Sequence, residues 1–185
     1  MSEFYAPMFS VPLFRYRLEG WSSKKARILQ ALPPDDEKLS PAPNTYTDYF
    51  ANRKGTSVPP YAHVIKDVLK PELEDFRSAY PEDLVLTSMW FERSYKSGYH
   101  GTHNHGSLGF SAVLYVEFDP AAHRPTRFIA PFQDFYSGSL VEYIPPKMDE
   151  GTLVLFPSVI LHEAQPHESG KARTIVSFNI RGGAQ

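Results

Sequence analysis

The chain has 185 residues and a formal net charge of −2, from 19 basic and 21 acidic side chains, a size typical of one domain. With 42% apolar and 22% charged residues, it has the composition of a folded protein rather than of a disordered tail or a coiled coil. The sequence contains no cysteine, which excludes disulfides and thiol catalysis, so any transition metal must be held by His, Asp or Glu.

The first part of the chain is predicted to contain short helices and proline-rich loops. Residues 31–60 hold many prolines, and because proline removes an amide donor and fixes φ, we expect extended loops there. A short helix is expected over residues 22–32, where Ser22 or Ser23 could cap it, and apolar residues at helical spacing predict a second helix over 62–80. Within the second helix, Pro71 is expected to introduce a kink or to split it in two.

After residue 82 the pattern changes to short β-strands. Runs rich in β-branched and aromatic residues, separated mostly by Gly, Pro, Asp or Asn, predict six strands, at 84–95, 110–118, 127–130, 140–143, 152–156 and 173–181. Several short strands of this kind indicate a β-sandwich or a barrel. We therefore expect a mainly β fold in a single domain over residues 1–185, with N-terminal helices and Pro-rich loops at 1–82 and a β core at 83–185.

The last predicted strand has two different faces. Val176, Phe178 and Ile180 alternate with polar residues, so they point to one side of the strand. Arg173, Ser177 and Asn179 share the opposite side with Arg181. We expect the apolar face to pack under the N-terminal helices and the polar face to look into a barrel mouth or toward water.

Three of the seven histidines fall within six residues, at His100, His103 and His105. Residues i and i+2 of an extended chain point to the same side, so His103 and His105 can approach one ion together, whereas His100 cannot easily join them. Imidazole is a good ligand for iron, zinc, copper and nickel. Taken alone, the cluster is as consistent with a polar surface loop as with a metal site.

His162 and Arg173 change this balance. His162 follows a predicted buried strand and a Pro-Ser turn, and alone it is best interpreted as a core histidine. Together with the His-x-His pair, however, it completes a set of three ligands with open coordination positions, as catalytic metals require. Arg173 lies eleven residues further on, and because a guanidinium grips a carboxylate through two hydrogen bonds, it points to an anionic co-substrate.

This set of residues resembles the 2-oxoglutarate/iron(II) dioxygenases, in particular a subgroup of small bacterial and phage proteins similar to prolyl 4-hydroxylases. The resemblance covers roughly residues 84–181. His103-x-His105 and the strand at 111–115 look like the first ligand motif of that group. The run at 151–158 with His162 and Arg173 looks like its second half, and residues 8–14 look like its opening strand.

The resemblance implies a fold, a ligand set and a reaction. The fold is a double-stranded β-helix, the jelly-roll or cupin-like barrel. His103, His105 and His162 would bind iron(II), although most members of the family have an acidic residue where this chain has His105. The reaction would use dioxygen to hydroxylate an unactivated C–H bond, with decarboxylation of 2-oxoglutarate to succinate.

The resemblance also implies how 2-oxoglutarate is held. Arg173 would bind its distal carboxylate, and Tyr115 is a further candidate for a hydrogen bond to the same molecule. Ser177 and Asn179 share the strand face of Arg173 and would line the pocket.

The third metal ligand is left open, because an imidazole at His105 does not neutralise the ferrous ion as a carboxylate would. Glu163 or Asp134 are alternative carboxylates, although neither has the usual position. Two other functions are also open: a cupin-type three-histidine metalloenzyme that does not use 2-oxoglutarate, and a non-enzymatic β-sandwich binding module.

The partners and the location of the protein are less closely constrained. The primary substrate is left open among a peptide, an amino acid and a small molecule, and a homodimer is left open too. The net charge disfavours nucleic acid. The sequence has neither the pattern of a signal peptide nor an apolar run long enough to span a bilayer, so we expect a cytoplasmic protein without membrane contact.

Overall fold

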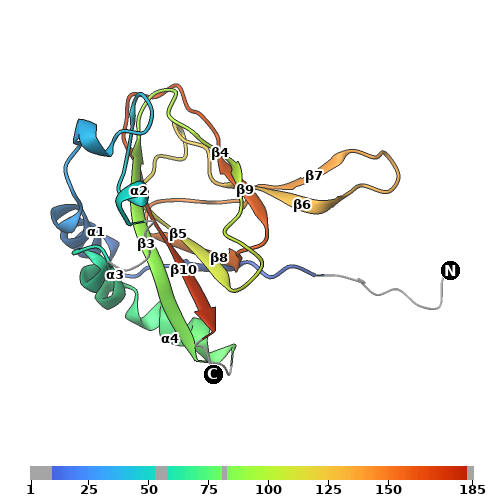
Figure 1. The fold of residues 1–185 in the computed structure, drawn as a ribbon, viewed down its shortest axis with the longest axis horizontal. Coiled ribbons are helices and arrows are strands. Elements are labelled where there is room, and N and C mark those ends of the chain that lie inside the picture. The colour runs from blue at the N-terminus through green and yellow to red at the C-terminus, as the bar shows by residue number, and fades with distance from the viewer. Residues whose placement is uncertain (1–9, 53–57, 81–82, 183–185) are drawn as a thin grey trace.

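The computed structural model describes residues 10–52, 58–80 and 83–182, which form two antiparallel β-sheets with helices on one side (Figure 1). The larger sheet has the order β1-β8-β5-β10-β3-β2 and the smaller sheet the order β4-β9-β6-β7. The strands of the larger sheet are β1 (Phe14–Arg17), β2 (Thr45–Thr47), β3 (Leu84–Ser94), β5 (Phe110–Glu117), β8 (Thr152–Pro157) and β10 (Arg173–Gly182). Those of the smaller sheet are β4 (His100–His103), β6 (Arg127–Gln133), β7 (Leu140–Tyr143) and β9 (Leu161–Ala164).

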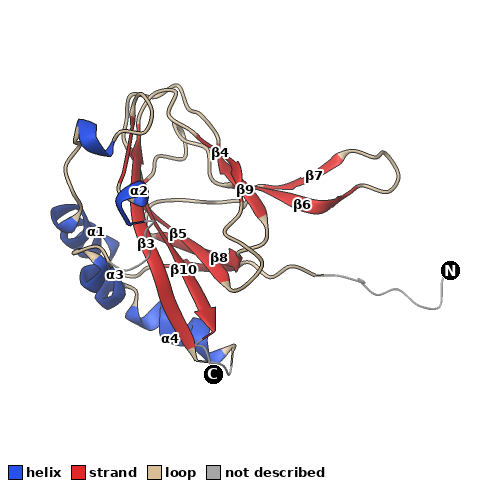
Figure 2. Ribbon diagram, viewed as in Figure 1, coloured by secondary structure: helices blue, strands red, loops and turns tan. Residues whose placement is uncertain are grey.

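Three helices, α1 (Trp21–Ala31), α3 (Ala62–Val68) and α4 (Lys70–Ser78), cover the outer face of the larger sheet, as the blue and red ribbons of Figure 2 show. Helix α2 (Tyr49–Asn52) lies against β3 instead, where the rings of Tyr49 and Trp90 are 5.0 Å apart, and a 3₁₀ turn spans Glu37–Leu39. Ile28, Ile65 and Phe76 from the helices form one buried cluster with Val176 and Phe178 of β10. This confirms that the apolar face of the last strand packs under the helices. None of the described helices is long and apolar enough to cross a bilayer.

A second buried cluster lies on the other face of the larger sheet, between the two sheets. It combines residues of the larger sheet, such as Val113, Phe156 and Ile175, with Phe128 from the smaller sheet. The side of β10 that carries Arg173 points into this interior, and both Arg173 and Ile175 are buried there. The interior between the sheets is therefore apolar around a few polar side chains, which is the setting of the candidate site.

All six predicted strands are confirmed to within a few residues, and the helix over 62–80 is split at Leu69 into α3 and α4, next to Pro71. The loop prediction for residues 31–60 is wrong in part, because β2, α2 and the 3₁₀ turn lie there. Asp48 stabilises this segment, since its carboxylate accepts hydrogen bonds from the Phe91 amide (2.9 Å) and the Tyr61 hydroxyl (2.8 Å). Strand β2 follows from pairing with β3, not from a periodic sequence pattern.

Strands β1, β4 and β9 were also not predicted, and each has only four residues, too few for a clear period-2 pattern. Part of the opening strand expected at residues 8–14 lies outside the described residues, and β1 begins at Phe14. Both β1 and β2 pair with the larger sheet, so the N-terminal part of the chain contributes strands as well as helices.

We expect Gly109→Ala to destabilise the junction between β5 and β10. Gly109 has φ +83°, and a Cβ atom there would lie 2.2 Å from the carbonyl oxygen of Ile180. No rotamer change relieves a clash with a backbone atom, so the free energy of unfolding should fall by about 2 kcal/mol or more. Urea unfolding measures the change. Gly170→Ala is the control, because its Cβ would meet no atom within 4 Å, and an equal loss in both variants would contradict the prediction.

Candidate active site

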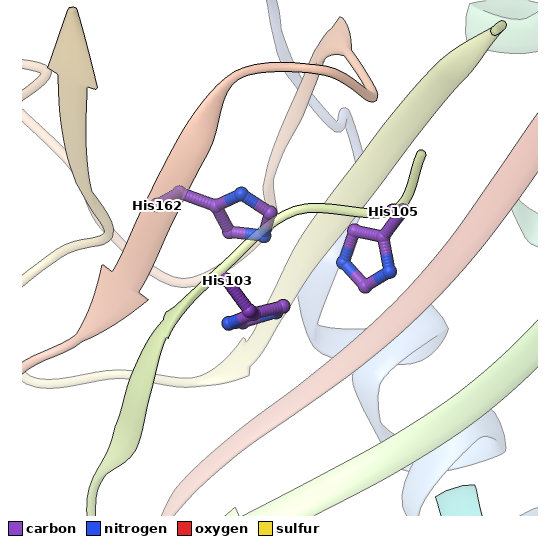
Figure 3. A group of neighbouring side chains, drawn as sticks. All are labelled: His103, His105 and His162. Atoms are coloured by element: carbon purple, nitrogen blue, oxygen red, sulfur yellow. The ribbon is translucent and has the colours of Figure 1, made fainter. Parts of the chain in front are cut away.

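Three histidines, two on strands of the smaller sheet and one just after β4, converge on one point (Figure 3). His103 is the last residue of β4 and pairs directly with His162 of β9. His105 follows two residues later, where its backbone amide donates a 2.9 Å hydrogen bond to the carbonyl of Ser158. One ring nitrogen of each lies within 4.8 Å of those of the other two. The three residues that the sequence singled out as ligands are thus brought together.

Hydrogen bonds fix which ring nitrogen is free in two of these histidines. Nδ1 of His103 lies 2.7 Å from the carbonyl oxygen of Gly101, and Nδ1 of His162 lies 2.9 Å from that of Ile160. A carbonyl oxygen can only accept, so each Nδ1 must carry the hydrogen. The lone pair of each ring is then on Nε2, which is the arrangement that a backbone carbonyl imposes on metal-binding histidines.

The surroundings keep the three rings neutral. Burial, together with the charges of the neighbouring histidines, lowers the pKa of His105 to about 4 and that of His162 to about 3. Burial and the nearby His100 also lower the pKa of His103. Because only the neutral ring has a lone pair to offer, all three imidazoles are in the metal-binding form at neutral pH.

His100 lies beside the cluster but is not part of it. Three residue steps along β4, from His100 to His103, span the same distance as two steps along β9, from Ala164 to His162, so β4 contains a bulge. The bulge brings the ring of His100 onto that of His103, with ring centres 4.1 Å apart and planes 17° from parallel. A regular strand would have placed these two rings on opposite sides.

Glu92 is the site residue that sequence reasoning missed. It lies on β3, is 3% exposed, and has an oxygen 2.8 Å from Nδ1 of His100. Burial disfavours its charged form, but the hydrogen bond and charge of His100, with the charge of Arg173, outweigh this and lower the pKa. The available signal was an acidic residue two positions from Trp90 within a buried strand, on the same face by period 2.

The two carboxylates considered as alternative ligands are engaged elsewhere. Glu163 lies 2.7 Å from a guanidinium nitrogen of Arg127 and also accepts a hydrogen bond from Thr102. Asp134 accepts hydrogen bonds from Ser137 in the exposed turn between β6 and β7. Neither belongs to the three-histidine group.

Arg173 is the second notable feature of the site. Its side chain is 1% exposed, and Nε, Nη1 and Nη2 have no hydrogen-bond partner among the described residues. The guanidinium carbon lies 5.8 Å from the ring centre of Tyr115. Burying a charged group without hydrogen bonds is costly, so such orphaned donors indicate a place where an anion fits.

The other residues predicted to contact a co-substrate differ in their positions. Ser177 lines the same cavity as Arg173 and the three histidines. The hydroxyl of Tyr115 is hydrogen-bonded to the side chain (2.7 Å) and the amide (2.9 Å) of Thr126, which lines that cavity. Asn179 is not among the residues that line the cavity, and its side-chain oxygen accepts a 2.8 Å hydrogen bond from Ser111.

The cavity that joins these groups is narrow. Its free volume is about 30 Å³, so a ligand larger than a water molecule or two enters only if lining side chains move. A wider groove of about 450 Å³ lies next to it, between residues 11–13 and the β6–β7 hairpin, and is mostly apolar. Phe156 lines both spaces.

Comparison with known proteins agrees with this architecture. Residues 88–179 match the model of a family described as "Putative 2OG-Fe(II) oxygenase". No curated protein matches the chain. Among solved structures, a prolyl-4-hydroxylase from Pseudomonas putida is 19% identical with a TM-score of 0.61, and the match covers 93% of each chain.

Two further solved structures have the same fold. HygX from Streptomyces hygroscopicus, solved with nickel, 2-oxoglutarate and hygromycin B, is 14% identical with a TM-score of 0.61, over 93% of this chain and 83% of that one. An oxidoreductase of the 2OG-Fe(II) oxygenase family from Burkholderia pseudomallei is 16% identical with a TM-score of 0.50. The match covers 68% of this chain but only 59% of the Burkholderia protein.

Two facing antiparallel sheets around a histidine cluster and a buried arginine define a protein of the double-stranded β-helix class. The segment that matches the family model contains all three histidines of the cluster and Arg173. The chain belongs to the 2-oxoglutarate/iron(II) oxygenase superfamily. Both the superfamily and the fold predicted from the sequence are therefore confirmed.

Proposed function

We propose that the protein is an iron(II)- and 2-oxoglutarate-dependent hydroxylase, in which His103, His105 and His162 hold the metal and Arg173 binds 2-oxoglutarate. One observation carries this proposal. A buried guanidinium without hydrogen-bond partners among the described residues lines the same cavity as three neutral imidazoles. The imidazoles suit a ferrous ion, and the guanidinium suits a carboxylate of the co-substrate.

The residues of the chain bind and orient the reactants and exclude water. Three imidazoles on one side of an ion leave its remaining coordination positions open to the co-substrate and dioxygen. A guanidinium that grips the distal carboxylate fixes the direction in which 2-oxoglutarate lies. The apolar side chains of Val113, Phe156 and Ile175 line the cavity and keep bulk water out. The chemistry supplied by iron(II) is oxidation of 2-oxoglutarate by dioxygen to succinate and carbon dioxide, coupled to hydroxylation of a C–H bond.

We place the primary substrate in the apolar groove between residues 11–13 and the β6–β7 hairpin. Its walls include Leu13, Phe128, Phe132 and Ile160, and Phe156 separates it from the histidine cavity. A substrate seated there would present an apolar surface and would bring one C–H bond toward the histidines. The proline of a peptide and an apolar small molecule both meet this description.

The proposal is tested by turnover without the primary substrate. The purified protein with iron(II) and 2-oxoglutarate should form succinate slowly in the presence of dioxygen. An unreactive analogue of 2-oxoglutarate should bind to the metal-loaded protein in a calorimetric titration. Absence of binding at millimolar concentration would contradict the proposed function.

A further inference from the structure

A buried carboxylate lies beside the histidine cluster on a strand that carries none of the three candidate ligands. Glu92 of β3 lines the same cavity as His103, His105 and Arg173. One of its oxygens, Oε2, is 2.8 Å from Nδ1 of His100. The other, Oε1, is buried and has no hydrogen-bond partner within the part of the chain that the structure describes.

The charges of the metal ion, its proposed ligands and Arg173 do not sum to zero. A divalent ion contributes +2 and Arg173 contributes +1, whereas 2-oxoglutarate contributes −2 and three neutral imidazoles contribute nothing. An acidic residue at position 105 would supply the missing negative charge, but this chain has His105. Uncompensated charge in a buried site costs free energy. A carboxylate near the metal position should therefore stabilise metal binding more than a carboxylate at the surface would.

Two carboxylates line the cavity, and their surroundings differ. Glu163 is paired with Arg127, at 2.7 Å, and Arg127 also pairs with Glu142, at 2.9 Å. Glu92 is bonded to a histidine instead, and that histidine stacks on the candidate ligand His103. Within the described chain, Glu92 is therefore paired with this histidine rather than with a guanidinium or ammonium group.

On the basis of the proposed function, we infer that Glu92 supplies, from outside the coordination sphere, the negative charge that His105 cannot provide as a ligand. Glu92 does not belong to the group of ligand atoms that lie within 4.8 Å of one another, and one of its oxygens is held by His100. It is a positioning residue that acts through His100 on the ring of His103. A carboxylate hydrogen-bonded to a histidine ligand orients the ring and strengthens metal binding, and Glu92 would act in this manner through one intervening histidine.

The experiment is a double-mutant cycle on the full-length, untagged and metal-free protein, titrated with Mn²⁺ in a calorimeter. Glu92→Gln keeps the shape of the side chain but removes its charge, and should weaken Mn²⁺ binding about 10- to 100-fold. His105→Asp places a carboxylate among the ligands. In the His105→Asp protein, Glu92→Gln should lower the affinity for Mn²⁺ by less than about threefold, because the carboxylate at position 105 already supplies the negative charge that Glu92 provides in the parent.

The control is Glu117→Gln. Glu117 lies outside the cavity, where it bonds to Thr174 and faces Arg93 at 3.9 Å, so its substitution should leave Mn²⁺ binding within about twofold of the parent. Equal Mn²⁺ affinity in the parent protein and in Glu92→Gln would overturn the inference. An equal loss of Mn²⁺ affinity from Glu92→Gln in the parent and in the His105→Asp protein would overturn it as well, since Glu92 and the carboxylate at position 105 would then act independently.

Two further outcomes have a defined meaning. If Glu92→Gln lowers the urea midpoint of the metal-free protein, Glu92→Asp, which keeps the charge, must restore most of the Mn²⁺ affinity; failure to do so would overturn the inference. A parent protein that does not bind Mn²⁺ at all would overturn the proposed function together with this inference. Normal binding by both the parent and Glu92→Gln would overturn only the inference.

Discussion

Arg173→Ala should abolish the binding of 2-oxoglutarate while the protein keeps its fold and its affinity for metal. The buried guanidinium makes no hydrogen bond within the described chain, so the substitution breaks none in the free protein. With the co-substrate bound, two charge-assisted hydrogen bonds of about 1.5–3 kcal/mol each would be lost. This corresponds to a loss of about 100-fold or more in affinity. Calorimetric titration of the Mn²⁺-loaded protein measures the change.

Arg181→Ala is the matched control, because Arg181 lies on the same strand but is exposed. The Arg173 variant also separates the proposed function from a three-histidine enzyme that does not use 2-oxoglutarate. Such an enzyme would keep its metal-dependent activity after the substitution. Unchanged affinity for 2-oxoglutarate in Arg173→Ala would remove the central argument for the proposed function.

His162→Ala should remove metal binding and, with it, turnover of 2-oxoglutarate. His162 is 4% exposed, and its ring is 4.7 Å from that of Phe156, so no other side chain can take its place without repacking the interior. Loss of an orienting neighbour of a metal ligand typically costs 10- to 100-fold in affinity, and loss of a ligand should exceed about 100-fold. Metal analysis after dialysis and succinate formation are the two measurements.

His63→Ala controls for a general effect of removing a histidine. His63 is exposed on α3, where its Nδ1 bonds to the carbonyl of Pro60, so the variant should bind metal like the parent protein. The protein must be purified without a histidine tag, since a tag would bind metal itself. A parent protein that contains no metal and takes up none would instead favour a non-enzymatic binding module.

The pattern of residues predicted the long elements well and the short ones poorly. Strand β10 has ten residues, enough for a clear alternation, and its two faces point where the alternation places them. Strands β4 and β9 have four residues each, and they exist because they pair with one another and with β6. Such pairing depends on tertiary structure, which a local pattern does not contain.

The same distinction applies to the site. The spacing of two predicted that His103 and His105 lie together, because that relation is local. The position of His162 beside them depends on the pairing of β4 with β9, which the chemistry of a three-histidine set and the resemblance to a family suggested but the local pattern did not. The bond between Glu92 and His100 could not be predicted from local spacing, since it requires β3 and β4 to meet across the two sheets.

Because of the bulge in β4, the spacing of His100 and His103 in the sequence does not predict that their rings lie together. With one extra residue between its two pairs with β9, β4 carries His100 to the ring of His103, three positions away, and within reach of Glu92. If β4 paired with β9 without a bulge, His100 would lie three positions from His103 in a regular strand and would point to the other face of the sheet. The bulge thus decides whether a buried acid is linked to the metal position, with every side chain of the site left unchanged.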